Sequence, residues 1–246
     1  MTFTARLRSV GPALFVGLIL ALLANYFLTG TLPVARQQLL EADVLGAQSL
    51  TLRLRANTGR VDVVPMTWTK GDLLRASVMH YGDLLFRVTG RTERLIIIED
   101  RSSRPFYNLT RAEDLVWRVR INPEIPLSLD YAAQAASSTL DLRAFRLRAL
   151  TAESSTGPLV AYLPKPETSY DVDWRGSTAL SEVILAQGTA AELRLSAAHA
   201  QIIGLEDAGR DEQAQVWRTP DFDPGRPHVS LRLSSAGEVR IRFDQP

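Results

Sequence analysis

Apolar and polar side chains alternate along most of the stretch 117–164. A β-strand with one buried face has this period of two. The stretch holds two copies of one unit, in which an alternating strand leads through a small residue to a second alternating strand. The small residues, Ala136 and Gly157, lie 21 residues apart, and a fixed period of about 20 to 50 residues is typical of stacked β units. The apolar positions are Leu127, Leu129, Tyr131, Leu140 and Leu142 in the first copy and Phe145, Leu147, Leu150, Leu159, Ala161 and Leu163 in the second.

The same alternation continues on both sides of this stretch. No segment after Gly46 has a helical period longer than two turns, which excludes α/β folds. The pattern predicts an all-β fold, a β-solenoid of stacked short strands with a period of about 21 residues. A β-sandwich is the alternative, but one unit is too small to bury its own apolar face, and stacking solves this. Strands are predicted at 50–54 and 61–63 around a turn at 57–59, at 84–88 and 95–98 around Gly90, at 170–174, 180–185, 193–195 and 202–203, and at 229–233 and 239–243, which close the chain after a long loop at 206–227.

The N-terminal segment has a different pattern. No charged residue lies between Arg8 and Arg36, and the interval 12–28 reads PALFVGLILALLANYFL. About 20 apolar residues in a helix span a membrane. A cleaved signal peptide is the alternative, but its apolar region is usually only about 7 to 15 residues long. We therefore predict an uncleaved, single-pass signal anchor in the bacterial inner membrane, with the N-terminus inside because Arg6 and Arg8 precede the helix.

These patterns divide the chain into four predicted parts. Residues 1–30 form the cytoplasmic tip and the transmembrane anchor, and 31–46 form a juxtamembrane linker with a short amphipathic helix at 34–45, whose apolar positions have helical spacing. An N-terminal β part follows at 47–110, and the main solenoid occupies 111–246. The soft boundary between these two parts lies at the polar stretch RSSRPFYN. Everything after about residue 30 is then expected outside the inner membrane, in the periplasm or its equivalent.

Composition excludes several classes of function. The net charge of +1 provides no overall field that would attract nucleic acid. The chain has no cysteine, so disulfides and thiolate metal sites are absent. The three histidines are far apart, and no cofactor is predicted. Asp221 and Asp223 resemble the opening of a calcium loop without its later ligands. Asp171 and Asp173 share one face of a strand and offer a catalytic alternative, a glycoside hydrolase.

Arginine rows are the surface feature that points to binding. They alternate with residues predicted to be buried, so stacked strands would line them up on the outer surface. Pairing with the equally abundant Asp and Glu within the chain is the favoured interpretation. The alternative is contact with an anionic envelope polymer, a lipid headgroup or an acidic partner. The residues of this predicted interaction surface are Arg143, Arg146, Arg148, Arg232, Arg240 and Arg242, together with Trp68, which has threonines on both sides.

The motifs of the central stretch resemble the bacterial toast-rack or adhesin-like family and the C-terminal domain of LiaF-like cell-wall stress proteins. The resemblance rests on a Trp-x-Val lead, an Asn-Pro pair, a Pro-Leu-x-Leu segment and a Leu-Asp-Leu segment. The family's Gly-Ala-Gly turn reads Gln134-Ala135-Ala136 here. The resemblance implies a β-solenoid at the cell envelope and no catalytic residues. The matching residues are Trp117, Val119, Asn122, Pro123, Pro126, Leu127, Leu129, Leu140, Asp141, Leu142, Leu147, Leu150 and Gly157.

Together these observations predict a non-enzymatic, membrane-anchored interaction or scaffold module of the envelope. Its favoured role is that of an accessory subunit, with its solenoid docked on a membrane or envelope complex. An adhesin or stress-sensing module that binds envelope polymer is the alternative, and the glycan-cleaving enzyme is a third. Because the end strands of a solenoid have unpaired backbone groups, association with a protein partner or with a second copy is expected there.

Overall fold

The computed structural model describes residues 16–24, 35–67, 71–101, 115–176, 179–195, 200–202, 209–211, 216–235 and 238–244. Its contacts divide the chain into two units, Met1–Arg36 and Gln37–Pro246. The first unit contains a helix at 16–24. In the described part of the chain no helix has both the length and the apolar character needed to cross a membrane. Eight of the 17 residues of the predicted anchor at 12–28 lie outside the described residues, and so does the segment 197–199 between the predicted strands at 193–195 and 202–203.

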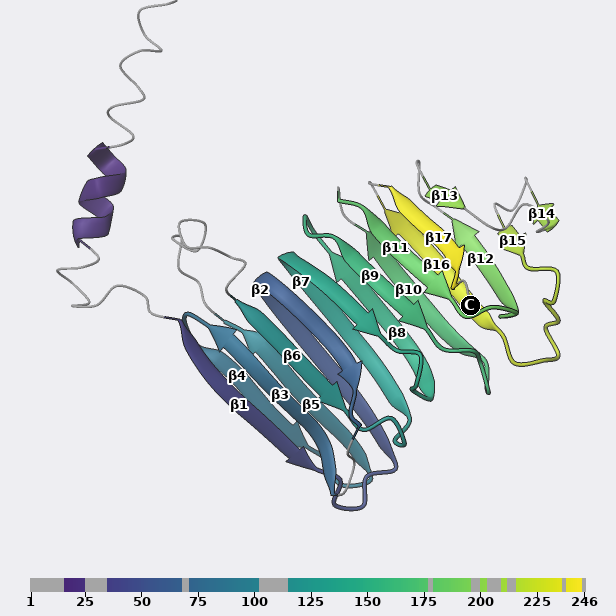
Figure 1. Ribbon diagram of the computed structural model, residues 1–246, viewed down its shortest axis with the longest axis horizontal. Helices are drawn as coiled ribbons and strands as arrows, with labels where there is room; N and C mark the ends of the chain where they lie inside the picture. The colour runs from purple at the N-terminus through teal and green to yellow at the C-terminus, as the bar shows by residue number, and fades with distance from the viewer. Residues whose placement is uncertain are drawn as a thin grey trace, which may run out of the picture. The chain divides into compact units, whose positions relative to one another are not determined.

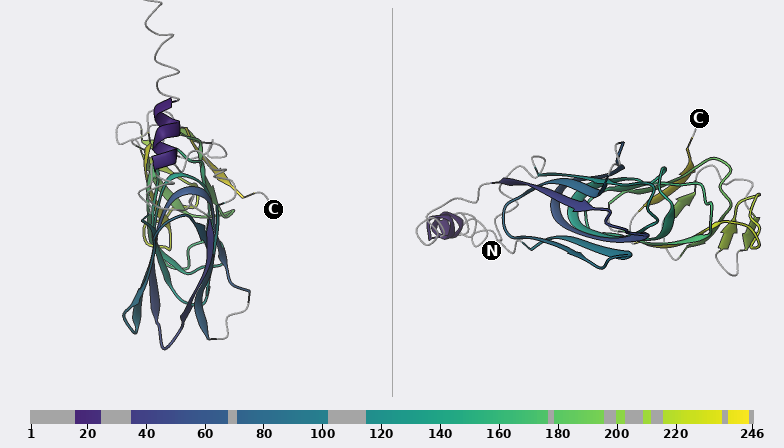
Figure 2. Two further views of the ribbon diagram at one scale, coloured as in Figure 1. Left: turned by 90° about the vertical axis from the view of Figure 1, so that its left-hand side faces the viewer. Right: turned by 90° about the horizontal axis from the view of Figure 1, so that it is seen from below.

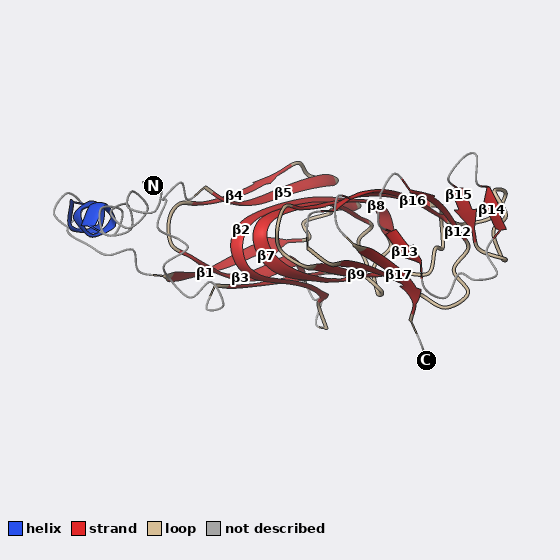
Figure 3. Cartoon of the chain, turned by 90° about the horizontal axis from the view of Figure 1, so that it is seen from above, coloured by secondary structure: helices blue, strands red, loops and turns tan. Residues whose placement is uncertain are grey.

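The second unit is a stack of β-strands arranged in two facing layers (Figures 1 and 3). The described strands form one connected open sheet, since β2 and β7 bend from one layer into the other. Figure 2 shows this bend when the stack is viewed along its length. Layer A contains β4 (Leu84–Thr89), β5 (Glu93–Asp100), the first parts of β2 (Ser49–Pro65) and β7 (Leu127–Asp141), β8 (Leu147–Ser154), β10 (Tyr170–Gly176), β16 (Val229–Ser235), β12 (Ala191–Leu195), β15 (Val216–Arg218) and β14 (Gly209–Asp211).

Layer B faces layer A across the core. It contains β1 (Arg36–Asp43), β3 (Asp72–His80), β6 (Val116–Ile121), the second parts of β2 and β7, β9 (Leu159–Leu163), β11 (Ser181–Leu185), β17 (Val239–Phe243) and β13 (Ala200–Ile202). Neighbouring coils pair in parallel, whereas the strands that cap the ends of the stack, including β3, β4 and β15, pair antiparallel. The predicted solenoid-like β architecture is therefore confirmed.

Equivalent apolar residues of successive coils form ladders through the core. Leu129 pairs with Leu150 of the next coil, and Leu150 pairs in turn with Val172 of the coil after that. Because parallel in-register pairing places equivalent side chains on top of one another, each coil buries the apolar face of the next. The ladder contains Leu52, Leu129, Leu150, Val172, Leu231 and Leu193, all at most 2% exposed.

The order of the coils departs from the order of the chain. β16 pairs with β10 on one side and with β12 on the other. β17 likewise pairs with both β11 and β13. The C-terminal coil, which closes the chain in sequence, is inserted between two earlier coils of the stack. The chain makes this return through 203–228, where the predicted long loop contains the short strands β14 and β15.

Two sequence predictions need correction. The segment predicted as an amphipathic juxtamembrane helix at 34–45 contains strand β1, an edge strand paired with β3. Its buried residues are Leu40 and Ala42, at i and i+2, whereas Leu39 and Leu45 are 73% and 71% exposed. The helical spacing was fortuitous, because it depended on Leu39 and Leu45, which face solvent.

The turns predicted at 57–59 and at Ala136 are bends within continuous strands and do not reverse the chain. Gly59 has φ +101° and pairs with Ala136. A Cβ atom on Gly59 would lie 2.1 Å from the carbonyl oxygen of Leu115, and one on Gly157 would lie 2.0 Å from that of Ala136. Small residues therefore stack in a column at this corner because the backbones of neighbouring coils approach too closely for larger ones.

Candidate functional site

The six arginines of the predicted interaction surface do not lie in one row. Arg232 lies on the outer face of layer A, in strand β16, whereas Arg240 and Arg242 lie on the outer face of layer B, in β17. The other three belong to the corner where β7 of layer B leads into β8 of layer A: Arg143, Arg146 and Arg148. Trp68 lies outside the described residues. The stack therefore places the arginines of the predicted rows at three separate positions.

The layer B arginines are paired within the chain, as the favoured interpretation predicts. Nε of Arg240 lies 2.7 Å from Oε1 of Glu238, and Arg242 is bonded to Glu182 of the neighbouring strand β11. The hydrogen bond to Glu182 raises the pKa of Arg242 above its ordinary value. Arg232 differs, since no acidic side chain among the described residues forms an ion pair with it.

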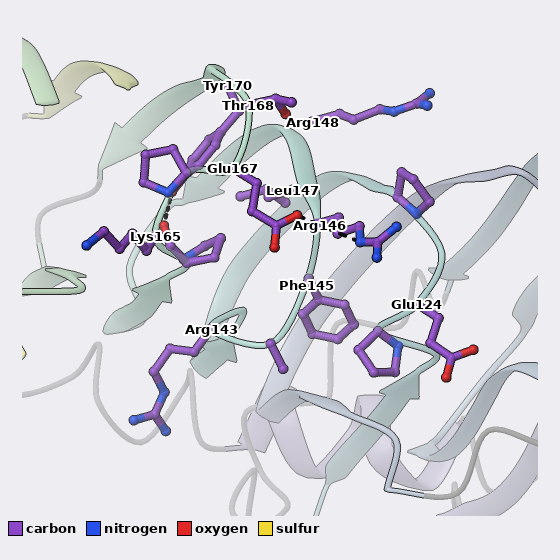
Figure 4. A pocket seen from close by; sticks show the side chains of 15 residues that line it. Glu124, Arg143, Phe145, Arg146, Leu147, Arg148, Lys165, Glu167, Thr168 and Tyr170 are labelled. Atoms are coloured by element: carbon purple, nitrogen blue, oxygen red, sulfur yellow. Dashed lines mark hydrogen bonds and ion pairs between the residues drawn. The ribbon is translucent and has the colours of Figure 1, made fainter. Parts of the chain in front are cut away.

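The corner between β7 and β8 contains a hollow of about 550 Å³. Its walls are three stacked turns, at 122–126, 142–146 and 164–169, which connect layer B to layer A in successive coils. Figure 4 shows that the side chains of Arg143 and Arg146, from the middle turn, and of Arg148, from the start of β8, point in different directions. The charged residues that line this corner groove are Glu124, Arg143, Arg146, Arg148, Lys165 and Glu167, four basic and two acidic.

A β-bulge explains why Arg148 lines the groove. Leu127 pairs with Leu147, but the next residue of β7, Ser128, pairs with Ala149, so Arg148 is the extra residue of β8. A bulge leaves its extra residue outside the ladder and can redirect its side chain. No described acidic residue pairs with Arg148. Arg146 has only a long contact with Glu167, at 3.9 Å between Nε and Oε2, and both side chains are largely exposed.

Arg143 links the corner groove to the outer face of layer B. Its guanidinium lies 2.8 Å from Oδ2 of Asp141 and 3.3 Å from Oδ2 of Asp244, and it stacks 4.8 Å above the ring of Tyr162. The hydrogen bond from Arg143 lowers the pKa of the Asp141 carboxyl, although burial opposes the shift. These contacts fix Arg143 at the border of the two surfaces.

A second hollow, of about 430 Å³, lies on that outer face. It is lined by Arg60, Arg118, Arg120 and Arg143, with Asp62 and Asp141 as its acidic residues. Sequence reasoning missed Arg118 and Arg120. The signal was present, since both alternate with the buried residues Trp117, Val119 and Ile121 in β6. In the described residues neither Arg118 nor Arg120 forms an ion pair. The positive charge of this hollow is therefore less neutralised than that of the paired Arg240 and Arg242 on the same layer.

One residue of each acidic pair considered for catalysis or calcium binding, Asp173 and Asp223, has a partner within the chain. Asp173 pairs with Arg175 at 2.9 Å on the outer face of layer A, next to Asp171 in the same strand. Oδ1 of Asp223 accepts a hydrogen bond from the Gly225 amide, and its Oδ2 lies 3.4 Å from Arg226. Within the described ranges there is no group of three or more His, Cys, Asp or Glu that could hold a metal ion.

Comparison with known proteins assigns the fold to a family. The family model described as "N-terminal domain of toast_rack, DUF2154" matches residues 30–177. The chain belongs to the toast-rack family. The matched range covers every residue that lines the corner groove and the second hollow, whereas Asp244, which contacts Arg143, lies beyond it. The predicted resemblance to toast-rack proteins is thus confirmed.

The toast-rack fold is also present in a solved structure of a "putative cell adhesion protein" from Clostridium sporogenes, with a TM-score of 0.73 at 12% identity over 86% of this chain and 100% of that one. A "putative adhesin" from Bacteroides fragilis covers 86% of this chain and 99% of its own at 8% identity, but its TM-score of 0.33 supports no argument. No curated protein matches the sequence.

The structure gives physical roles to the toast-rack motif residues. Trp117 is 1% exposed and donates a hydrogen bond from Nε1 to the carbonyl oxygen of Met79 at 3.1 Å. Asn122 is 2% exposed, donates from Nδ2 to the carbonyl oxygen of Asp72 and accepts the Glu124 amide at Oδ1. The motif thus shapes the first of the turns that line the corner groove, because a buried side-chain amide replaces the missing backbone partners.

Proposed function

We propose that this toast-rack protein is a membrane-anchored, non-catalytic scaffold of the bacterial envelope, held by its N-terminal apolar segment with the β stack outside the inner membrane. Its role is that of an accessory subunit that presents the outer faces of the stack to a larger envelope complex. The observation that carries the proposal is the parallel in-register stack itself, in which exposed rows of side chains are fixed by buried ladders.

The apolar segment supports the anchor. The interval 12–28 contains no charged residue, and Arg6 and Arg8 precede it. A segment of about this length and polarity spans the hydrocarbon layer, and basic residues favour the cytoplasmic side. The family match begins at residue 30, immediately after this segment. The proposal therefore gives the two units different places, one in the membrane and one outside it.

The side chains of the stack support an interaction role over a catalytic one. Several acidic groups at the described surface have arginine partners, among them Asp141, Asp173 and Glu192. A glycoside hydrolase needs a carboxylic acid with a raised pKa next to an ionised carboxylate. The hydrogen bond from Arg143 lowers the pKa of Asp141. Although burial opposes the shift, hydrogen bonds from Arg218 and Arg194 lower the pKa of Glu192. Neither of these two carboxyls is therefore such an acid. The family and the fold of the Clostridium sporogenes protein agree with a binding module.

Isolation of the full chain from native membranes tests the scaffold role. We expect particles in mild detergent to exceed the mass of the chain plus its detergent, with a second component at fixed stoichiometry, as light scattering measures it. The same particles should cleave no envelope glycan. A chain that elutes alone and cleaves glycan with a dependence on Asp171, abolished in the Asp171→Asn variant, would overturn the proposal.

A further inference from the structure

We propose that the toast-rack stack binds a linear polyanion, a soluble polymer with repeated phosphate or carboxylate groups, along one continuous basic track. The track is defined by the basic residues of the two hollows: Arg60, Arg118, Arg120, Arg143, Arg146, Arg148 and Lys165. It runs from the outer face of layer B around the corner between β7 and β8. The track excludes the ion-paired Arg240 and Arg242.

Cations without partners make the track attractive to anions. Among the described residues, no acidic side chain forms an ion pair with Arg118, Arg120, Arg148 or Lys165. The arginines at positions 118, 120 and 148 are exposed, as is Lys165. Guanidinium groups bind phosphate and carboxylate in a bidentate manner. The near-zero net charge of the chain therefore hides a local excess of positive charge on this side of the stack.

The position of Arg120 gives independent support. In the antiparallel pair β3–β6, Arg120 lies directly opposite Arg75. Like charges directly opposite each other destabilise a sheet. Arg75 is neutralised by Asp72 at 2.8 Å, but nothing comparable neutralises Arg120 among the described residues. A bound anion would offset the repulsion between Arg120 and Arg75. Binding would thus remove a source of instability that the free protein has.

The geometry of the track favours a flexible polymer over a flat anionic surface. Arg143 lines both hollows, so a ligand that follows the track passes from one to the other at this residue. One hollow lies on the face of layer B and the other lies among the corner turns that lead to layer A. A flat membrane could contact only one of them at a time, whereas a chain molecule can bend around the corner and occupy both.

The inference rests on the proposed function in one respect, because the stack has to lie outside the inner membrane to meet an envelope polymer. The chemistry of the track can be tested without that assumption. Binding by the purified full chain in detergent reports on the track alone, whereas the orientation of the chain in the membrane is a separate measurement. If the binding experiment fails, the orientation of the chain can still be interpreted, and the reverse also holds.

The test uses long-chain inorganic polyphosphate as the probe and isothermal titration calorimetry on the full chain. We expect the double variant Arg118→Gln/Arg120→Gln to raise the Kd by about tenfold or more and to weaken the salt dependence of binding. The matched control is Arg175→Gln/Arg194→Gln, which removes two exposed arginines from layer A. It lowers the net charge by the same amount as the track variant does, so a change in Kd of less than about twofold shows that binding depends on the track and not on the net charge.

Two further measurements test the track. Without polyphosphate, Arg120→Gln should unfold at a temperature equal to or above that of the unaltered protein, since it removes the repulsion with Arg75. Tripolyphosphate, too short to occupy both hollows, should bind far more weakly than the long polymer. Equal losses in the track and control variants, no binding of long polyphosphate, or tighter binding to phosphatidylglycerol vesicles than to the polymer would each overturn the proposal.

Discussion

Replacing Gly157 with alanine should destabilise the stack by more than about 3 kcal/mol, because overpacking against backbone cannot be relieved by a side-chain movement. The added Cβ atom would lie 2.0 Å from the carbonyl oxygen and 2.6 Å from the carbonyl carbon of Ala136. Both atoms belong to β7, the long strand that contributes to both layers. Chemical denaturation of the purified protein measures the loss.

Gly225→Ala is the matched control. A Cβ atom on Gly225 would approach only Oδ1 of Asp223, at 3.3 Å, and that oxygen belongs to an exposed side chain. We expect this variant to stay within about 0.5 kcal/mol of the unaltered protein. If Gly157→Ala were as stable as Gly225→Ala, the close approach of coils at the corner column would be wrong.

Replacing Leu231 with alanine should cost about 2 to 5 kcal/mol, the usual range for a fully buried leucine. Leu231 is fully buried in the core ladder between Val172 and Leu193. Because β16 is inserted between two earlier coils, the damage should spread in both directions. Hydrogen exchange should therefore accelerate in β12 at least as much as in β10, and more than in β2.

The exposed neighbour Arg232 provides the control, since Arg232→Thr keeps a residue that suits a strand and removes nothing from the core. Its exchange pattern should match that of the unaltered protein. A stack built in chain order would instead place the C-terminal coil at the end, next to β12 alone. Accelerated exchange in β12 with no change in β10 would therefore contradict the inserted position.

Much of the core could be predicted from the sequence, since alternation identifies the buried face of a strand without knowledge of its neighbours. Trp117 and Trp174 occupy apolar positions of this alternation, and both are at most 1% exposed. The predicted period holds where no insertion interrupts the chain, as between Leu129 and Leu150. Local pattern and stacking geometry agree there because successive coils have nearly the same length.

The order of the coils could not be predicted. Leu193 and Leu231 occupy equivalent rungs of the same ladder, and each presents the same kind of apolar surface to its neighbour. Alternation therefore fits either order, and only the return of the chain through 203–228 decides it. Strand β1 was not predicted for a related reason. An edge strand buries few residues, so the period of two is not visible in its sequence.

The candidate site was predicted in part. Arg143, Arg146 and Arg148 do lie together at one corner, and Arg240 and Arg242 do pair with acids as the favoured interpretation held. A strand alternates between two faces, but the sequence does not reveal which strands share a layer. Arg118 and Arg120 could be joined to Arg143 only once β6, β2 and β7 were placed side by side.

Labelling of single cysteines tests the central claim, an anchored stack outside the inner membrane, most directly. The chain has no cysteine, so Thr2→Cys and Arg175→Cys each introduce a unique thiol, and the Arg175 position is exposed. A membrane-impermeant maleimide applied to intact spheroplasts should label the Arg175→Cys variant at once and the Thr2→Cys variant only after lysis. Labelling of Arg175→Cys only after lysis would place the stack in the cytoplasm and contradict the account.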